Sequence, residues 1–304
     1  MPQPMPDQPG EVFPPEIEEM IFSMAVQANW SSAKTLVLVA KRVHHWLIPQ
    51  LYEVVIFHEN QISNPRPKFD SGKLIDRGKH VKHIMFFQMY LLSNRPGECL
   101  AWCPNAVDVA LWITPDLYDK TLIDQLLCHR LTHLSFDFGT LRNKLGEHPE
   151  ILKPTSFPFV THLELINSTT AVTSDELREH FPALTHLALN ASGPNFPDLE
   201  HLALDAFGPN LISVTPGVLT LWKDQMKVLL WYRGETTSPY PVAMSPDSGF
   251  PSPPDDARLV VIRYGRGYVG TWYEGTRGGL SIWRVAEEAI AARAQQVANR
   301  GSVD

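Results

Sequence analysis

Apolar residues recur with helical spacing near the start of the chain. Residues 1–12 hold four prolines and little that could be buried, which predicts a flexible tail. Pro14 and Pro15 suit the first turn of a helix, because their missing N–H groups need no partner there. The apolar residues that follow at positions i, i+3, i+4, i+7 and i+8 predict one face of this helix: Ile17, Met20, Ile21, Met24 and Ala25.

A second helix and a strand are predicted next. Residues 29–32 interrupt the first helix and offer side chains that cap the next one. The apolar spacing then predicts a helix from Ala33 to Trp46, which Pro49 should end. The β-branched stretch from Glu53 to Phe57 predicts the first strand.

From about residue 78 an apolar-x-x-apolar-x-apolar pattern repeats six times. The segments are VKHIMF (81–86), AVDVAL (106–111), LTHLSF (131–136), VTHLEL (160–165), LTHLAL (184–189) and LEHLAL (199–204). Their middle apolar residues, which we call anchors, are Ile84, Val109, Leu134, Leu163, Leu187 and Leu202, at spacings of 25, 25, 29, 24 and 15. The first four spacings are typical of a strand with a returning helix or loop, stacked on its neighbours. The last spacing indicates either a bare loop or a lost segment.

The C-terminal part predicts two more strands and a helix. Residues 227–232 and 258–264 have strand character, and the Pro/Ser-rich residues between them predict a disordered loop over 236–257. A glycine- and aromatic-rich turn precedes a helix from about Leu280 to Ala298. Its apolar side should face the body and cap the open end of the stack: Trp283, Ala286, Ile290 and Val297.

Composition narrows the class of protein. Among 304 residues, 44% are hydrophobic and the net charge is −7, which predicts a folded chain whose partner is not nucleic acid. Three cysteines fit a reducing compartment, and no segment has the features of a signal peptide or a membrane span. We therefore expect a cytoplasmic or nuclear protein with no membrane contact.

Motifs of catalysis are absent from the sequence. There is no G-x-S-x-G, P-loop, H-E-x-x-H or dinucleotide-binding glycine pattern, and the cysteines lack the paired spacing of a zinc site. We expect no enzyme activity, no catalytic residues, no cofactor and no metal. An enzyme of unrecognised type stays open as an alternative.

Residues 13–55 resemble an F-box. The residues that match its pattern are Pro14, Glu16, Ile21, Phe22, Val39, Lys41, Arg42, Trp46 and Pro49. Phe13 replaces the usual leading leucine, and Ala40 stands where cysteine or serine is common.

The later part resembles the F-box and leucine-rich-repeat-like proteins of mushroom-forming fungi, through its HLxL units and TWYEGTRGGLSIW at 271–283. This resemblance implies an α/β fold with an F-box-like helical module, an irregular leucine-rich-repeat-like solenoid and a C-terminal strand-helix cap. The corresponding ranges are 13–57, 58–235 and 258–304.

The resemblance also implies a function. The chain would be a substrate-receptor subunit of a cullin-type ubiquitin ligase, monomeric when free, which binds a Skp-type adaptor and an unknown protein target. The alternative is a repeat scaffold without a ubiquitin role, whose first helices only cap the solenoid.

Two sets of site residues follow. The expected adaptor-docking residues are Phe13, Pro14, Ile17, Ile21, Leu36, Val39 and Trp46. They would otherwise only pack the helices against the first strand. Apolar groups on a small module commonly dominate an interface.

Alternation along the strands places the expected target-binding residues on the concave side of the sheet. They are Met85, Phe87, Trp112, His133, Asp137, His162, Glu164, His186, Asn190 and His201. Because neighbouring strands lie about 4.8 Å apart, the recurring histidines could stack into a ladder. A copied repeat unit explains them more simply than a metal site does. The alternative is that loops or the C-terminal cap cover this side of the sheet.

Overall fold

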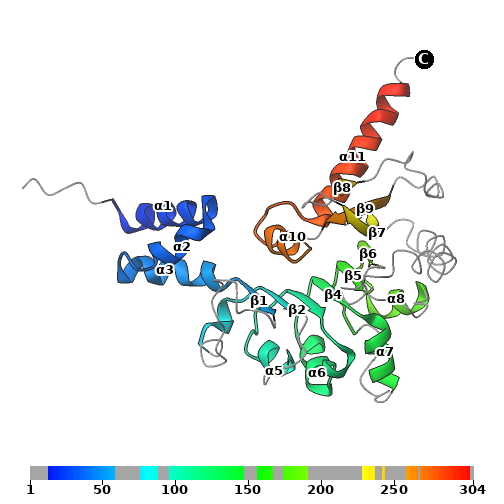
Figure 1. The fold of residues 1–304 in the computed structure, drawn as a ribbon, viewed down its shortest axis with the longest axis horizontal. Coiled ribbons are helices and arrows are strands. Elements are labelled where there is room, and N and C mark those ends of the chain that lie inside the picture. The colour runs from blue at the N-terminus through cyan, green and yellow to red at the C-terminus, as the bar shows by residue number, and fades with distance from the viewer. Residues whose placement is uncertain are drawn as a thin grey trace, which may run out of the picture. The chain divides into compact units, whose positions relative to one another are not determined.

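The computed structural model divides the chain into two compact units, residues 1–53 and 54–304, which are described separately (Figure 1). The residues described are 13–58, 76–87, 96–146, 156–166, 174–190, 228–236, 242–243, 258–265 and 268–301. The predicted tail, the sixth repeat segment with Leu202 and His201, and most of the predicted loop over 236–257 lie outside them.

The first unit is helical. Its elements are α1 (Pro15–Ala28), the 3-10 turn η1 (Trp30–Ser32), α2 (Ala33–Leu36) and α3 (Lys41–Tyr52). One buried apolar cluster joins them: Val26, Ala33, Val43 and Leu47. The first helix is where the apolar spacing predicts it.

The prediction of one helix from Ala33 to Trp46 is wrong. Ala40 has extended backbone angles, φ −156° and ψ 154°, and so separates α2 from α3. Pro49 lies inside α3 instead of ending it. Proline leaves one backbone carbonyl of the preceding turn without its helical donor. The turn after it is nevertheless kept, since Leu51 packs against the apolar cluster of the unit.

The second unit is built on a sheet. Its described residues form nine strands in the order β1-β2-β3-β4-β5-β6-β7-β9-β8, parallel except for the pair β8 and β9. The strands are β1 (Val54–His58), β2 (His83–Phe87), β3 (Asp108–Trp112), β4 (His133–Phe136), β5 (His162–Ile166), β6 (His186–Asn190), β7 (Val228–Thr236), β8 (Val242–Ala243) and β9 (Leu259–Gly265). The first strand and the two late parallel strands confirm the predictions. The strand β8 falls within the segment predicted to be a disordered loop.

The predicted anchors pair in exact register across the sheet. Ile84 pairs with Val109, and the same column continues through Leu134, Leu163 and Leu187. Val55 extends the column at one end, and Leu229 and Leu259 extend it at the other. The strand beside β6 is therefore β7, which begins at residue 228. Five of the six anchor assignments are confirmed in this way.

Four helices cover the first face of the sheet, on which the anchors lie (Figure 1). They are α5 (Pro96–Ala101), α6 (Lys120–Cys128), α7 (Phe138–Gly146) and α8 (Ser174–His180). Each contributes a fully or almost fully buried leucine to the main core: Leu100, Leu122, Leu141 and Leu177. Burial of one such side chain stabilises a fold by about 1.5–3 kcal/mol, so each crossover helix holds its strand pair in place.

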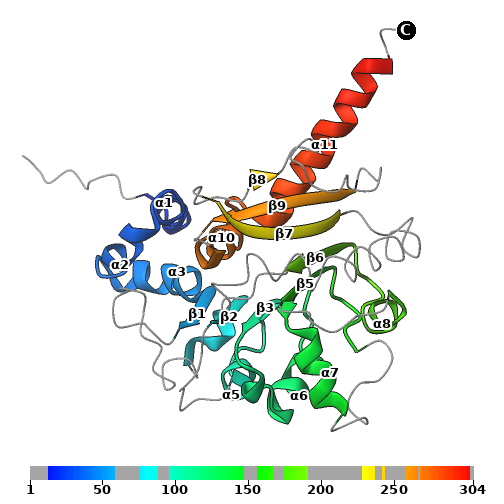
Figure 2. The same cartoon turned by 45° about the vertical axis from the view of Figure 1, so that its right-hand side comes forward.

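Two C-terminal helices cover the second face of the sheet (Figure 2). The helix α10 (Tyr268–Gly275) packs Val269, Trp272 and Tyr273 against a cluster that includes Met85. The helix α11 (Ile282–Gly301) packs over β6 and β9 through the buried Ile282 and Ala286, Ala188 and Val260 among others.

The expected glycine- and aromatic-rich turn is therefore wrong, because its aromatic residues form α10. The helix α11 is present as predicted, but it lies on a face of the sheet near its last strands instead of across the end of the stack. Trp283, Ala286 and Ile290 pack on a face of the sheet, and Val297 is 71% exposed. The apolar residues on this face of the strands account for both differences, since they need a cover of their own.

Gly97 is expected to resist substitution. A methyl group there would lie 2.5 Å from the backbone nitrogen of Leu122, where α5 meets α6. Gly97→Ala should lower the free energy of unfolding by about 1–3 kcal/mol, as overpacking commonly does. Urea unfolding measures this, with Gly270→Ala in α10 as control, where a methyl group meets nothing within 4 Å. Equal stability of both variants would contradict the close α5–α6 contact.

The three cysteines should differ in reactivity. Cys99 and Cys103 are buried, whereas Cys128 is exposed. Burial raises the pKa of each buried thiol to about 12, so neither forms thiolate near neutral pH. A chromogenic thiol reagent at mildly alkaline pH should modify one group quickly and the other two only after denaturation. Rapid reaction of two or three thiols in the native protein would refute this.

Candidate functional site

The helix α1 carries apolar residues on two faces. Phe22 and Val26 face inward and pack against the apolar cluster of the first unit. On the other side a stripe of large apolar residues is exposed, which we call the docking surface: Phe13, Ile17, Met20, Ile21 and Met24. A helix that is apolar on both faces is typically covered on both, and within this unit only one face is covered.

Exposed apolar groups gather in the first unit. Of the nine large hydrophobic side chains exposed among the described residues, seven belong to it. Two of these, Leu38 and Val39, lie in the turn between α2 and α3. Single exposed apolar residues are ordinary, but a concentration of this kind marks an interaction surface.

Polar contacts fix α1 against α3. The Arg42 guanidinium lies 2.8 Å from a carboxylate oxygen of Glu18, and Gln50 Nε2 donates a hydrogen bond to Ser23 Oγ at 2.8 Å. Both contacts join the inward side of α1 to α3. They therefore hold the helix in the rotation that leaves the docking surface outward.

The seven predicted docking residues separate into two groups. Phe13, Pro14, Ile17, Ile21 and Val39 are exposed. Leu36 and Trp46 are partly buried and pack against the cluster of their own unit. Met20, Met24 and Leu38 are exposed as well, although they are not among the predicted docking residues. For the two methionines the signal was available, since they lie on the same predicted apolar face as Ile17.

The predicted target-binding side is the second face of the sheet, beneath α10 and α11. Met85, Trp112, Glu164 and His186 are buried there, while Phe87, His133, Asp137 and His162 are partly buried. Asn190 is placed only as the end of β6, opposite Ile166. The face is covered rather than open, which corresponds to the alternative that a C-terminal cap hides it.

Asp137 has a local role at the start of α7. Its carboxylate accepts hydrogen bonds from the backbone N–H and the hydroxyl of Thr140, both at 3.0 Å. Burial raises the pKa of Asp137, and these hydrogen bonds act in the opposite direction. Because its carboxylate bonds to Thr140 in the first turn of α7, Asp137 stabilises the start of this helix.

Three histidines stack at the starts of neighbouring strands, and we call them the histidine row: His133, His162 and His186. The ring centroids are 4.2 Å apart in the first pair and 4.0 Å in the second, with interplanar angles of 15° and 12°. The expected ladder is thus present. Within the described residues, no group of three His, Cys, Asp or Glu side chains is placed to hold a metal ion.

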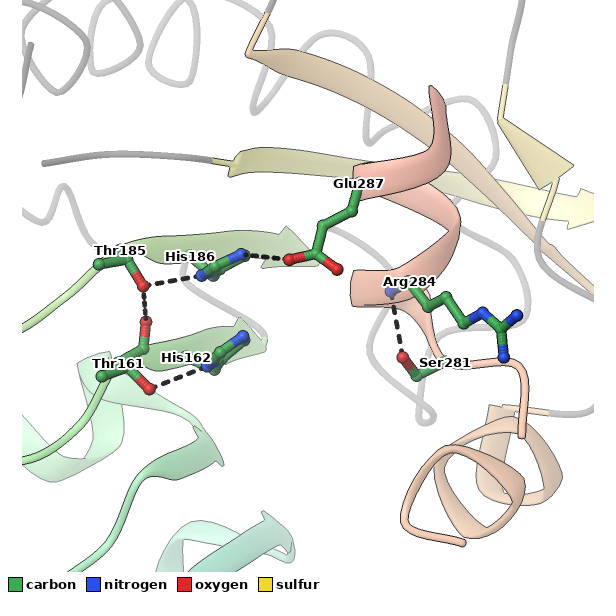
Figure 3. Close-up of polar contacts among 7 residues, drawn as sticks. All are labelled: Thr161, His162, Thr185, His186, Ser281, Arg284 and Glu287. Carbon is green, nitrogen blue, oxygen red and sulfur yellow. Dashed lines mark hydrogen bonds and ion pairs between the residues drawn. The ribbon is translucent and has the colours of Figure 1, made fainter. Parts of the chain in front are cut away.

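A threonine before each histidine orients the row. Thr161 Oγ1 lies 2.9 Å from His162 Nδ1 (Figure 3). It also lies 3.2 Å from the carbonyl oxygen of Thr132. Thr185 Oγ1 repeats this with His186 Nδ1 and the carbonyl of Thr161, at 2.8 and 3.1 Å. Each threonine therefore ties its strand to the preceding one and fixes the adjacent ring. The recurring Thr-His-Leu triplet was the signal for these threonines.

Carboxylates lie at both ends of this region. At one end, Asp108 Oδ2 is 3.0 Å from His83 Nδ1, and His133 is the register partner of Asp108. Burial lowers the pKa of His133, Asp108 counteracts this, and His83 adds to it. At the other end, Glu287 of α11 meets His186 at 3.2 Å.

Comparison of the chain with protein-family models, with curated proteins and with solved structures gave no match. None of the helices in the described part of the chain combines the length and apolar character needed to cross a membrane.

The exposed face of α1 and the buried apolar cluster of the first unit predict different responses to a charged substitution. Ile21→Asp should leave the thermal midpoint nearly unchanged, because Ile21 is 48% exposed. Val43→Asp should cost on the order of 3 kcal/mol or more, since Val43 is 1% exposed and its charge would be buried unpaired. Circular dichroism during heating distinguishes them. A large loss of stability in Ile21→Asp would mean that the docking surface is structural.

Proposed function

We propose that the chain is a protein-binding adaptor. The observation that carries this proposal is the docking surface, a stripe of exposed apolar side chains on a helix whose other face is already packed. Burying such side chains gains about 25 cal/mol per Å² of apolar area, which favours a protein partner over continued exposure. Methionine among them suits a surface that adapts to a partner.

More specifically, we propose a substrate-receptor subunit of a cullin-type ubiquitin ligase. The F-box resemblance of residues 13–55 supports a Skp-type adaptor as the partner of α1. The match includes Pro14 and Ile21, which are exposed, and Phe22, which packs inward. The adaptor would cover the stripe from Phe13 to Met24.

The second unit would be the target-binding body, an irregular leucine-rich-repeat-like solenoid in this proposal. Its support is a parallel sheet with strands in chain order and anchors in one register column. Because the second face is covered, a target approaching it would first meet the surface of α10 and α11. In this role the chain positions one protein beside another and performs no chemistry itself.

Co-expression with a Skp-type adaptor and affinity capture test the proposal. The unmodified chain should be captured, and the double variant Ile17→Asp, Ile21→Asp should bind at least roughly thirtyfold more weakly, as expected for loss of interface hot spots. Val297→Asp is the matched control, because it places the same charge on an exposed apolar position of α11. It should bind as the unmodified chain does.

Two outcomes would count against the ligase role. Absence of capture by a well-folded unmodified chain would leave the alternative, a scaffold whose first helices only cap its body. Equal capture of the double variant would remove the docking surface as the binding site, even if the adaptor binds elsewhere.

A further inference from the structure

The C-terminal helix meets the histidine row through two side chains. Glu287 Oε1 lies 3.2 Å from His186 Nε2. Trp283 contacts two rings, with centroid distances of 5.1 Å to His162 and 5.8 Å to His186. Figure 3 shows Glu287 pointing from α11 toward His186. We call these contacts of Glu287 and Trp283 the latch.

Hydrogen-bond accounting at His186 favours the doubly protonated ring. Thr185 has one hydroxyl proton and faces both the Thr161 carbonyl and His186 Nδ1. If the hydroxyl donates to the carbonyl, Nδ1 must carry a proton and donate to the hydroxyl oxygen. A carboxylate only accepts, so Nε2 must carry a proton to bond with Glu287. The imidazolium alone satisfies all these contacts at once, and the contacts act against the burial of the ring, which disfavours its charge.

The position of Trp283 also favours a protonated His186. Both faces of His162 are occupied, by His133 and His186. Trp283 therefore meets the imidazole edges, and its ring is inclined by 75° and 83° to the two histidines. An aromatic face attracts positive charge, so a protonated edge binds Trp283 more strongly than a neutral one.

Repulsion between neighbouring charges limits how many histidines of the row can be protonated at the same time. His162 stacks on His186 at 4.0 Å, and a second positive charge there would be repelled. Glu164 lies two residues further along β5 on the same face, and Asp108 and His83 lie beyond His133. On β7 the residue in register with His186 is Val228, which does not titrate.

On α11 the remaining nearby charges pair with each other. Arg284 donates to Glu288 at 2.9 Å. Figure 3 shows the Arg284 side chain turned away from His186. Glu287 is thus the charge of α11 that faces the row.

We propose that α11 is held on the second face of the sheet by a proton-linked latch, in which protonation of His186 tightens its contacts with Glu287 and Trp283. Binding of the proton and docking of the helix then strengthen each other by the same factor. The sign follows: docking gains stability as pH falls through the titration of His186 and loses it as pH rises. The latch is made within residues 161–290 and does not depend on the docking surface of α1.

Hydrogen exchange of the α11 amides from Ile282 to Ile290 tests the latch. After correction for intrinsic exchange, protection should be roughly two- to fivefold higher at about pH 6 than at about pH 8, the range expected for one partly exposed ion pair. Glu287→Gln should remove most of this difference, because the amide carries no charge and pairs with the neutral ring as well as with the protonated one; only the smaller part that comes from Trp283 should remain. Glu288→Gln is the matched control, being the adjacent carboxylate with a similar exposed fraction, 60% against 58%. It should behave like the unmodified chain.

Three results would overturn the proposal: protection that does not change with pH, protection that falls on acidification, or the same dependence in Glu287→Gln as in the unmodified chain. Protection of the amides of β4, measured in the same samples, separates the latch from a change in global stability. A pH response of equal size in β4 would also refute a local latch.

Discussion

Each apolar anchor in the sheet is the register partner of the anchor in the neighbouring strand, and this column is the constraint on which the second unit depends. Val55, Ile84 and Val109 begin the column, and leucines continue it to β9. A single strand with its helix cannot bury its apolar side, so each pair is stable only when the next one covers it. The helices α5 to α8 then lie on the anchor face because the leucines that complete the core are theirs.

The second face of the sheet is under a different constraint. It is polar at the starts of the strands and apolar further along. Threonine hydroxyls join successive strands and set the histidine rings in parallel. Beyond them, residues such as Met85 and Trp112 need cover, and α10 supplies it. The result is a face with polar contacts to α11 at one edge and apolar packing elsewhere. The alternation of residues along the strands predicts the same face as a binding surface, because it distinguishes the two faces of the sheet but does not determine what covers them.

In the first unit, by contrast, many large apolar side chains are not covered. Its apolar cluster is small, and α1 places more large apolar groups in solvent than in that cluster. The ion pair of Arg42 and Glu18 fixes this orientation. Exposure of apolar area is unfavourable for the free chain, and the proposed partner would remove this area from water.

The sequence alone predicted the elements whose pattern repeats or alternates: α1, the anchors from Ile84 to Leu187, the strands β7 and β9, and the histidine ladder. These depend on local periodicity, which a helix or strand imposes on its own residues. The sequence did not predict the break at Ala40, the continuation of α3 past Pro49 or the helix α10, because packing outweighs the local signal at those residues. What only the tertiary structure decided is which faces are covered. The exposed side of α1 and the cover of α10 and α11 over the second face depend on contacts between distant segments, and no spacing within one segment encodes them.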